Sequence, residues 1–192
     1  MNGRYNNYDS EEMAERSYNE IQQKANSNML MQGVSAIFGG VITAGVDVAV
    51  IGTHYVPMFN NIRAIYGRGS VDGSVIIPVI KNILSECLFD IAFDKVVGYI
   101  PIVGIYTNVM CAKTLTWRLG ILFAMLASRG EEVVSDKVKD CVIVIRNMFP
   151  QNSAVKLAQP DYSTFKKMVM SVHDNTEAEF AEKINKAKDA FK

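Results

Sequence analysis

Three carboxylates that repeat every four positions are the residues best suited to metal chemistry. Glu86, Asp90 and Asp94 would lie on one face of a helix. Carboxylates stacked in this way ligate metals in helical bundles, where a histidine at short helical spacing completes the site. Neither histidine of the chain, His54 or His173, lies near them in the sequence. We therefore interpret the stripe as a solvated helix face and expect no metal ligands.

A glycine-rich stretch, residues 67–74, is the segment best suited to binding phosphate. It contains Arg68 and leads into a predicted helix, and free backbone N–H groups at a helix start can hold an anion. Its glycine spacing matches neither the P-loop motif nor the dinucleotide-binding fingerprint. We therefore favour a turn between two helices, in which Ser70 or Asp72 caps the second helix.

The histidines and cysteines form no recognisable nucleophilic or redox motif. His54 lies close to Pro57, which is typical of a polar group at a helix kink. The three cysteines are far apart in the sequence, which argues against a disulfide framework or a zinc site: Cys87, Cys111 and Cys141. The sequence predicts no catalytic residue, no cofactor-binding residue and no metal ligand, and an enzyme is the least favoured class.

The composition predicts a single domain and does not favour binding to nucleic acid. A chain of 192 residues, 49% of them hydrophobic, is long enough to bury a sizeable core. Its 20 basic residues balance 20 acidic ones, so no net charge attracts it to nucleic acid. We expect no signal peptide, because no short apolar segment follows a basic start. The cysteine pattern fits a reducing cytosol.

The chain is organised around residues 96–128, in which only Lys113 and Arg118 are charged. Pro101 suits the first turn of a helix, where its missing N–H costs nothing. Apolar side chains then occur on nearly every face of the predicted helix. Such a helix lies either in a protein core or in lipid. The rest of the chain must therefore pack on it.

Small residues repeat every fourth position before this central helix. Ala36, Gly40 and Ala44 would lie on one helix line, a spacing that lets two helix backbones approach closely. Each interior glycine costs about 1 kcal/mol relative to alanine, so this stretch needs tight packing. We expect the line to cross the central helix inside the protein. The uncharged residues 26–46 are also long enough to span a bilayer, so a membrane-inserted hairpin is the alternative.

Amphipathic patterns predict further helices around this centre. A first helix would run from residue 10 to about 26, capped by Asp9. Pro57 would end or kink the chain before a short helix that stops at Gly67. Further helices are predicted over residues 75–97, 131–148, 162–172 and 177–191.

We thus predict an all-α fold, a compact multi-helix bundle around a glycine-rich hydrophobic helical hairpin. Residues 1–9 would be a disordered N-terminus. Residues 10–172 would form the helical domain, with its core in 26–149. Residues 174–192 would form a C-terminal amphipathic helix, packed on this domain or appended to it.

The last predicted helix carries one apolar stripe, formed by Phe180, Ile184 and Phe191. This stripe is a candidate docking face for a partner protein, although packing on its own domain is the simpler interpretation.

Two segments resemble a helical domain of unknown function, the YcjF-type domain. The first segment contributes Asp47, Met58, Tyr66 and Gly67, and the second contributes Pro101, Gly104, Asn108, Thr116 and Gly120. The resemblance covers roughly residues 40–128. The chain departs from the family pattern where residues 43–46 replace a Pro-Gly before the aspartate, and where Ile102 replaces a glycine.

The YcjF-type domain follows the G domain of some bacterial GTPases and also occurs in inner-membrane proteins. The resemblance therefore implies a bacterial accessory module at the cytoplasmic face of the inner membrane, peripheral or partly embedded. Its partner would be a GTPase or another protein, with the membrane surface as a further contact, and the module could form oligomers. The alternative is a toxin or effector whose glycine-rich hairpin inserts into membranes.

Overall fold

The computed structural model describes residues 7–27, 48, 51–83, 104–132, 159–173 and 176–189. Their named elements are α1 (Asn7–Ala25), the π-helix η1 (Ile51–Tyr55), α4 (Val56–Ile65), α6 (Gly104–Arg129), α9 (Tyr162–His173) and α10 (Glu177–Asp189). Residues 73–83 form a further helix. These described segments contain helices and no strand, so the predicted all-α bundle is confirmed.

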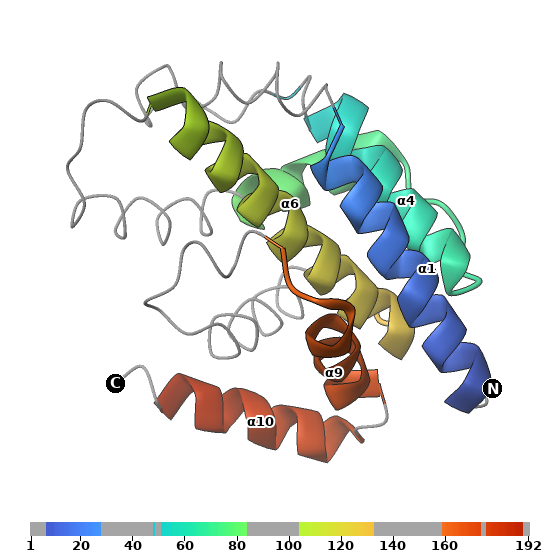
Figure 1. Ribbon diagram of the computed structural model, residues 1–192. Coiled ribbons are helices and arrows are strands. Elements are labelled where there is room, and N and C mark those ends of the chain that lie inside the picture. Colours follow the sequence, from blue (N-terminus) through green and yellow to red (C-terminus); the bar gives the residue numbers. More distant parts are fainter. Residues whose placement is uncertain are drawn as a thin grey trace.

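Helix α6 is the centre of the bundle, as the sequence predicts. It crosses the middle of Figure 1, with α1 and α4 along one side and α9 at its C-terminal end. Apart from Arg118, every residue from Thr114 to Ser128 is buried. Its apolar side chains cover its whole circumference, and this all-round burial is what such a pattern requires.

Helices α1 and α6 run antiparallel and approach most closely at Gly120. Near one end of the pair, Lys113 Nζ donates a hydrogen bond of 3.0 Å to Asn26 Oδ1. At Gly120, a built Cβ would lie only 2.5 Å from Cγ1 of Ile21. The missing side chain therefore sets the distance between the two helices.

An aromatic cluster, Tyr18, Trp117, Tyr162 and Phe165, joins α1, α6 and α9. The ring centroids of Tyr18 and Trp117 lie 5.1 Å apart, and those of Tyr18 and Phe165 lie 5.5 Å apart in an edge-to-face arrangement. Trp117 and Phe165 are fully buried. Aromatic pairs at such distances add to the stabilisation that comes from burial alone.

Two helices end at a glycine with positive φ, and the first of these ends, at Gly67, is predicted by the sequence. Gly67, after α4, has φ 65°, and Gly130, after α6, has φ 71°. The N–H of Arg68 then bonds the carbonyl of Arg63, and that of Glu131 bonds the carbonyl of Leu126. This hydrogen bonding satisfies the last helical carbonyls.

The start of α1 differs from the prediction. The helix begins at Asn7, so Asp9 lies within its first turn and is not its N-cap. An acidic side chain in the first turn still favours the helix, because its negative charge interacts favourably with the positive, N-terminal end of the helix dipole.

Pro57 lies in the first turn of α4, directly after the π-helix η1. A proline ring crowds the carbonyl four residues earlier and lacks an N–H. The wider turn of a π-helix gives that ring room. The predicted break at Pro57 is thus a local widening of the helix.

Several predicted features lie outside the described residues. These are the small-residue line Ala36, Gly40 and Ala44, the signature residues Asp47 and Pro101, the carboxylate stripe Glu86, Asp90 and Asp94, and Phe191.

A search for membrane spans covered the described residues. None of their helices combines the length and the apolarity that crossing a bilayer needs.

Candidate functional site

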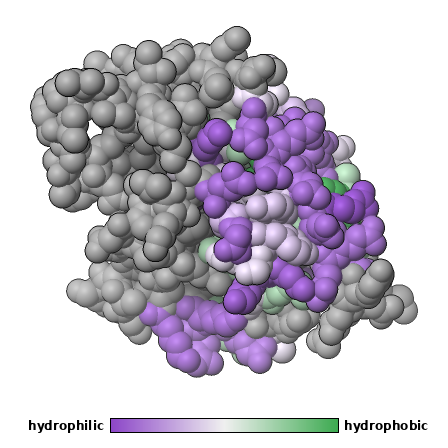
Figure 2. Space-filling view, viewed as in Figure 1, coloured by the Kyte–Doolittle hydropathy of each residue, from purple (hydrophilic) through white to green (hydrophobic). Residues whose placement is uncertain are grey.

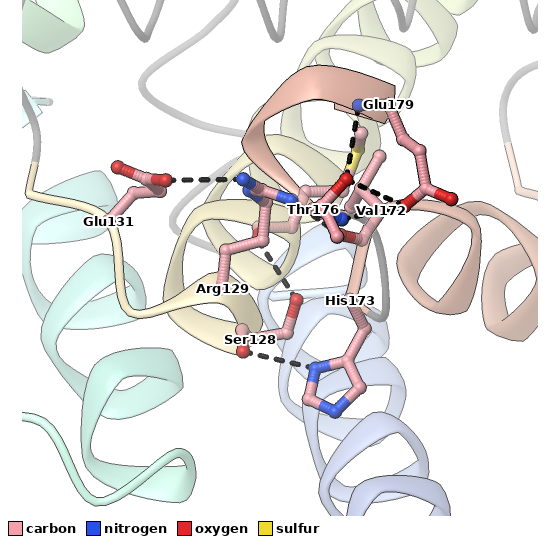
Figure 3. A network of polar contacts seen from close by, with 8 residues as sticks. Ser128, Arg129, Glu131, Val172, His173, Thr176 and Glu179 are labelled. Carbon is pink, nitrogen blue, oxygen red and sulfur yellow. Dashed lines mark hydrogen bonds and ion pairs between the residues drawn. The ribbon is translucent and has the colours of Figure 1, made fainter. Parts of the chain in front are cut away.

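A polar cluster of the described residues lies where α6, α9, α10 and the start of α1 meet. We call it the α6 junction, and Figure 3 shows part of it, with Ser128, Arg129, Glu131 and His173 labelled. Its members are Ser10, Ser128, Arg129, Glu131, His173 and Phe180. Most of them lie at or near helix ends: α6 ends at Arg129, α9 ends at His173, and α10 begins four residues later, at Glu177.

His173 connects two other helices through both nitrogens of its ring. Nδ1 lies 3.0 Å from the carbonyl oxygen of Ser128, near the end of α6, and Nε2 lies 3.0 Å from Oγ of Ser10 on α1. A carbonyl can only accept, so Nδ1 carries the proton. In the neutral ring, Nε2 then accepts the hydroxyl hydrogen of Ser10.

This serine–histidine geometry is that of an activated nucleophile with a carbonyl in place of the orienting carboxylate. Ser10, however, is only 2% exposed. A hydroxyl buried within a helix cannot meet the carbonyl carbon of a substrate. We therefore interpret the Ser10–His173–Ser128 chain as a tie between three helices.

Arg129 is the second connector of the junction. Its Nη1 donates a 2.8 Å hydrogen bond to the carbonyl of Val172 on α9, and its Nη2 lies 3.4 Å from a carboxylate oxygen of Glu131. Its guanidinium also lies 4.1 Å from the ring centre of Phe180 on α10. A cation at the C-terminal end of α6 is favoured by the helix dipole.

A capping box positions α10 over Arg129. The backbone N–H of Thr176 donates a 2.7 Å hydrogen bond to Oε2 of Glu179, and the N–H of Glu179 bonds Oγ1 of Thr176 at 3.3 Å. The backbone N–H of Thr176, and then its hydroxyl, donate to the carboxylate and lower the pKa of Glu179. The cap fixes the first turn of α10, from which Phe180 enters the core.

The proposed docking stripe on α10 is therefore interrupted. Phe180 is fully buried under Arg129, so in this conformation it packs on its own domain. Ile184 lies on α10, but its side chain is outside the described residues, as is Phe191.

The glycine-rich stretch forms a turn between α4 and the helix that follows it. Asn60 holds it from α4 by two hydrogen bonds to the backbone of Val71, of 2.9 and 3.1 Å. Asp72 caps the following helix, since its Oδ1 accepts from the N–H of Ser74 at 2.8 Å. The hydrogen bonds from Ser74 lower the pKa of Asp72, and a negative charge at the start of the helix repels a second anion such as phosphate. The predicted cap by Asp72 is confirmed.

The signature residues are placed along the helices as packing positions. Met58 and Tyr66 are fully buried, and Thr116 lies 3.5 Å from the hydroxyl oxygen of Tyr55. Gly120 adjoins Ile21. Gly104 begins α6, and Asn108 lies in its second turn with a side chain outside the described residues. The structure does not bring these residues together into one site.

A cofactor or metal would need a cluster of ligands. Among the described residues, no three histidine, cysteine or acidic side chains are close enough to hold a metal ion.

Sequence reasoning missed the α6 junction. The pattern Thr-x-x-Glu at residues 176–179 is the capping-box signal that could have located the start of α10. Nothing in the sequence pairs Ser10 with His173, because 163 positions separate them. The packing of both α1 and α9 on α6 brings them together.

Comparison with models of protein families, with curated proteins and with solved structures finds no match to this chain. The resemblance to the YcjF-type domain accordingly stays a prediction.

The contacts of Arg129 predict a measurable contribution to stability. Replacing it by glutamine removes the bond to Val172, the ion pair with Glu131 and the cation over Phe180. We expect the free energy of unfolding to fall by about 2–3 kcal/mol, because a buried carbonyl loses a charged donor. Urea denaturation measures this change.

The matched control is Lys186→Gln in α10. Lys186 forms an exposed ion pair with Glu182 at 2.7 Å. Exposed pairs contribute roughly 0–1 kcal/mol, so this variant should unfold almost as the parent does. Equal losses in both variants would show that Arg129 does not join the helices.

Proposed function

We propose that this chain is a non-enzymatic helical module that binds a GTPase or another protein at the cytoplasmic face of a bacterial inner membrane. The observation that carries the proposal is that the reactive side chains of the α6 junction join helices. Ser10, Arg129 and His173 are all engaged in hydrogen bonds between helices. A bundle fixed in this way is suited to presenting a rigid surface to a partner.

The surface offers a first contact point for such a partner. On the face shown in Figure 2 most of the described surface is hydrophilic, with small hydrophobic patches. The exposed large apolar side chains of the described residues are Val48, 52% exposed, and Val75, 62% exposed. Val75 belongs to the helix 73–83, whose Ile77 lies near Gly52 of η1. Val75, the more exposed of the two, is therefore the position at which we test for a contact with the partner.

Photo-crosslinking tests the proposal at this point. A crosslinking amino acid at position 75 should capture a GTPase in bacterial inner-membrane preparations, identified by mass spectrometry and by GTP hydrolysis of the captured protein. Position 64 is the matched control, because Ala64 is exposed on α4 and is not part of an apolar patch. The same adducts at both positions, or none at position 75, would contradict the proposal.

The second candidate, a membrane-inserting toxin or effector, is favoured by the uncharged residues 26–46. It predicts that the purified protein releases a dye from liposomes of bacterial lipids. An accessory module should bind such liposomes or its partner without causing leakage.

A further inference from the structure

The π-helix η1 interrupts the regular α-helical hydrogen bonding of the bundle. π-Helices are rare and often mark functional sites. Here η1 is followed directly by α4, whose second residue, Pro57, cannot supply a backbone N–H to the preceding turn. Helical hydrogen bonding is therefore already reduced between η1 and α4. The chain can bend there at a lower cost than within a regular helix.

His54 lies inside this weak turn and is only 4% exposed. Its ring stands edge-on to the ring of Tyr55, with centroids 5.0 Å apart. Its Nε2 is buried and has no hydrogen-bond partner among the described residues. A neutral imidazole tolerates this position at a modest cost. A charged imidazole would be a buried cation without an acceptor, which is far more costly.

The charges of the described residues around η1 disfavour a positive charge on the ring of His54. Burial first, and then the field of Lys24 on α1, lower the pKa of His54 from 6.5 to about 4. Tyr55 offers no negative charge, because burial raises its pKa to about 12. The other packed elements carry Lys113 on α6, Arg63 on α4, and Asp72 and Lys81 beside and within the helix 73–83. Of the described charges, that of Lys24 is the one that acts on the ring.

The packing of η1 and α4 shows which buried side chains would become exposed if this part of the bundle opened. Phe59 of α4 meets Phe123 of α6 edge-on, with ring centroids 4.9 Å apart. Ile51 and Met58 are also fully buried. These side chains would reach solvent if η1 and the first turn of α4 moved away from α6.

We propose that His54 is an acid-sensitive latch. A proton on its ring releases η1 and the start of α4 from the bundle and exposes Ile51, Met58 and Phe59. The device is built into the fold, and its state is set by the pH around the protein.

The direction of the pH effect follows from the pKa of His54 in the packed state and in the released state. Above pH 6.5 the ring is neutral whether η1 is packed or released, so packing has its full stability. As the pH falls below 6.5, the released ring takes up a proton, while the packed ring stays neutral until about pH 4. Release therefore becomes more favourable throughout this window. At pH 5 its equilibrium constant should be about 30-fold larger than at pH 7.5.

Hydrogen exchange of the backbone amides in residues 51–65 measures this release. After correction for the pH dependence of intrinsic exchange, we expect about 30-fold more opening at pH 5 than at pH 7.5. His54→Phe keeps an aromatic ring beside Tyr55 and removes the proton site, so its opening should not change with pH. Lys186→Gln, an exposed change on α10, should keep the response of the parent.

A direct titration keeps the proposal testable if His54→Phe fails to fold. The chain has 2 histidines, so an NMR titration of the unaltered protein resolves both rings. We expect the resonance of His54 in the packed state to titrate well below pH 6.5. Titration near pH 6.5 in the packed protein, or equal pH responses of the parent and His54→Phe, would overturn the proposal.

Discussion

Replacing Gly120 by leucine is expected to lower the free energy of unfolding by about 3 kcal/mol, at the upper end of typical overpacking costs. A Cβ at this position would lie 2.5 Å, 2.7 Å and 2.7 Å from Cγ1, Cδ1 and Cγ2 of Ile21. Ile21 is branched at Cβ, and its χ1 is strongly restricted in a helix, so its side chain cannot turn aside at low cost. Relief then requires α1 to move away from α6. Thermal and urea unfolding of the parent and the variant measure the loss.

The cause can be isolated with a double-mutant cycle. Gly120→Ala and Ile21→Ala should each destabilise the protein, the first by crowding and the second by leaving a cavity. The double variant should lose less than the sum of the two losses, by roughly 0.5–3 kcal/mol, because the new Cβ occupies the vacated space. Additive losses would show that the two residues do not limit the approach of the helices.

Gly73→Ala is the matched control for a glycine at the start of a helix. A Cβ there would meet Ile77 and Val56 only at 3.8 Å and 4.0 Å, which is ordinary contact. Its stability should be unchanged or slightly higher, since alanine favours the helix. A loss as large as that of Gly120→Leu would make general intolerance of glycine replacement the better explanation.

Sequence patterns were most informative where one physical term dominates. The all-round apolar character of residues 96–128 predicts a central helix, and α6 (Gly104–Arg129) is that helix in the described part of the chain. Gly67 and Gly130 end helices because glycine alone adopts a positive φ without strain. Asp72 caps the helix 73–83 through the short-range preference of an aspartate for backbone N–H groups.

The α6 junction could not be predicted in the same way. His173 meets Ser10 and Ser128 only after α1, α6 and α9 have packed, and no periodicity encodes that meeting. The small-residue spacing predicts a close crossing at Gly40, which lies outside the described residues and stays a prediction. Within the described residues, a close approach of two helices occurs at Gly120. A small residue indicates that a close crossing is allowed, but not which helix makes it.

The burial of His54 illustrates the same limit. Its neighbour Pro57 predicts a break in the helix, and the break is present as η1. A sequence pattern cannot show whether a polar side chain at a break faces water or the core. The packing around η1 decides that, and it places the ring in the core without a described partner for Nε2.

Phe165→Ala is expected to lower the free energy of unfolding by about 3–5 kcal/mol, the usual cost of removing a buried phenylalanine. Phe165 is fully buried and meets Tyr18 and Trp117 edge-on, with centroids 5.5 Å and 6.5 Å away. Truncation leaves a cavity between α1, α6 and α9 and removes both ring contacts. A loss of this size is a large share of the 5–15 kcal/mol by which such domains are typically stable.

The fluorescence of Trp117 reports on this cavity directly, because it is the chain's 1 tryptophan. In Phe165→Ala the emission of the folded protein should shift to longer wavelength as water reaches the ring, and the urea midpoint should fall. Tyr162→Phe is the matched control in the same cluster. It keeps the ring 5.6 Å from Tyr18 and removes only the hydroxyl, which donates a 3.3 Å hydrogen bond to the carbonyl of Glu11. That variant should lose about 1 kcal/mol or less and keep the parent emission. If Phe165→Ala matched it in both measurements, α9 would not be held to α1 and α6 by this cluster.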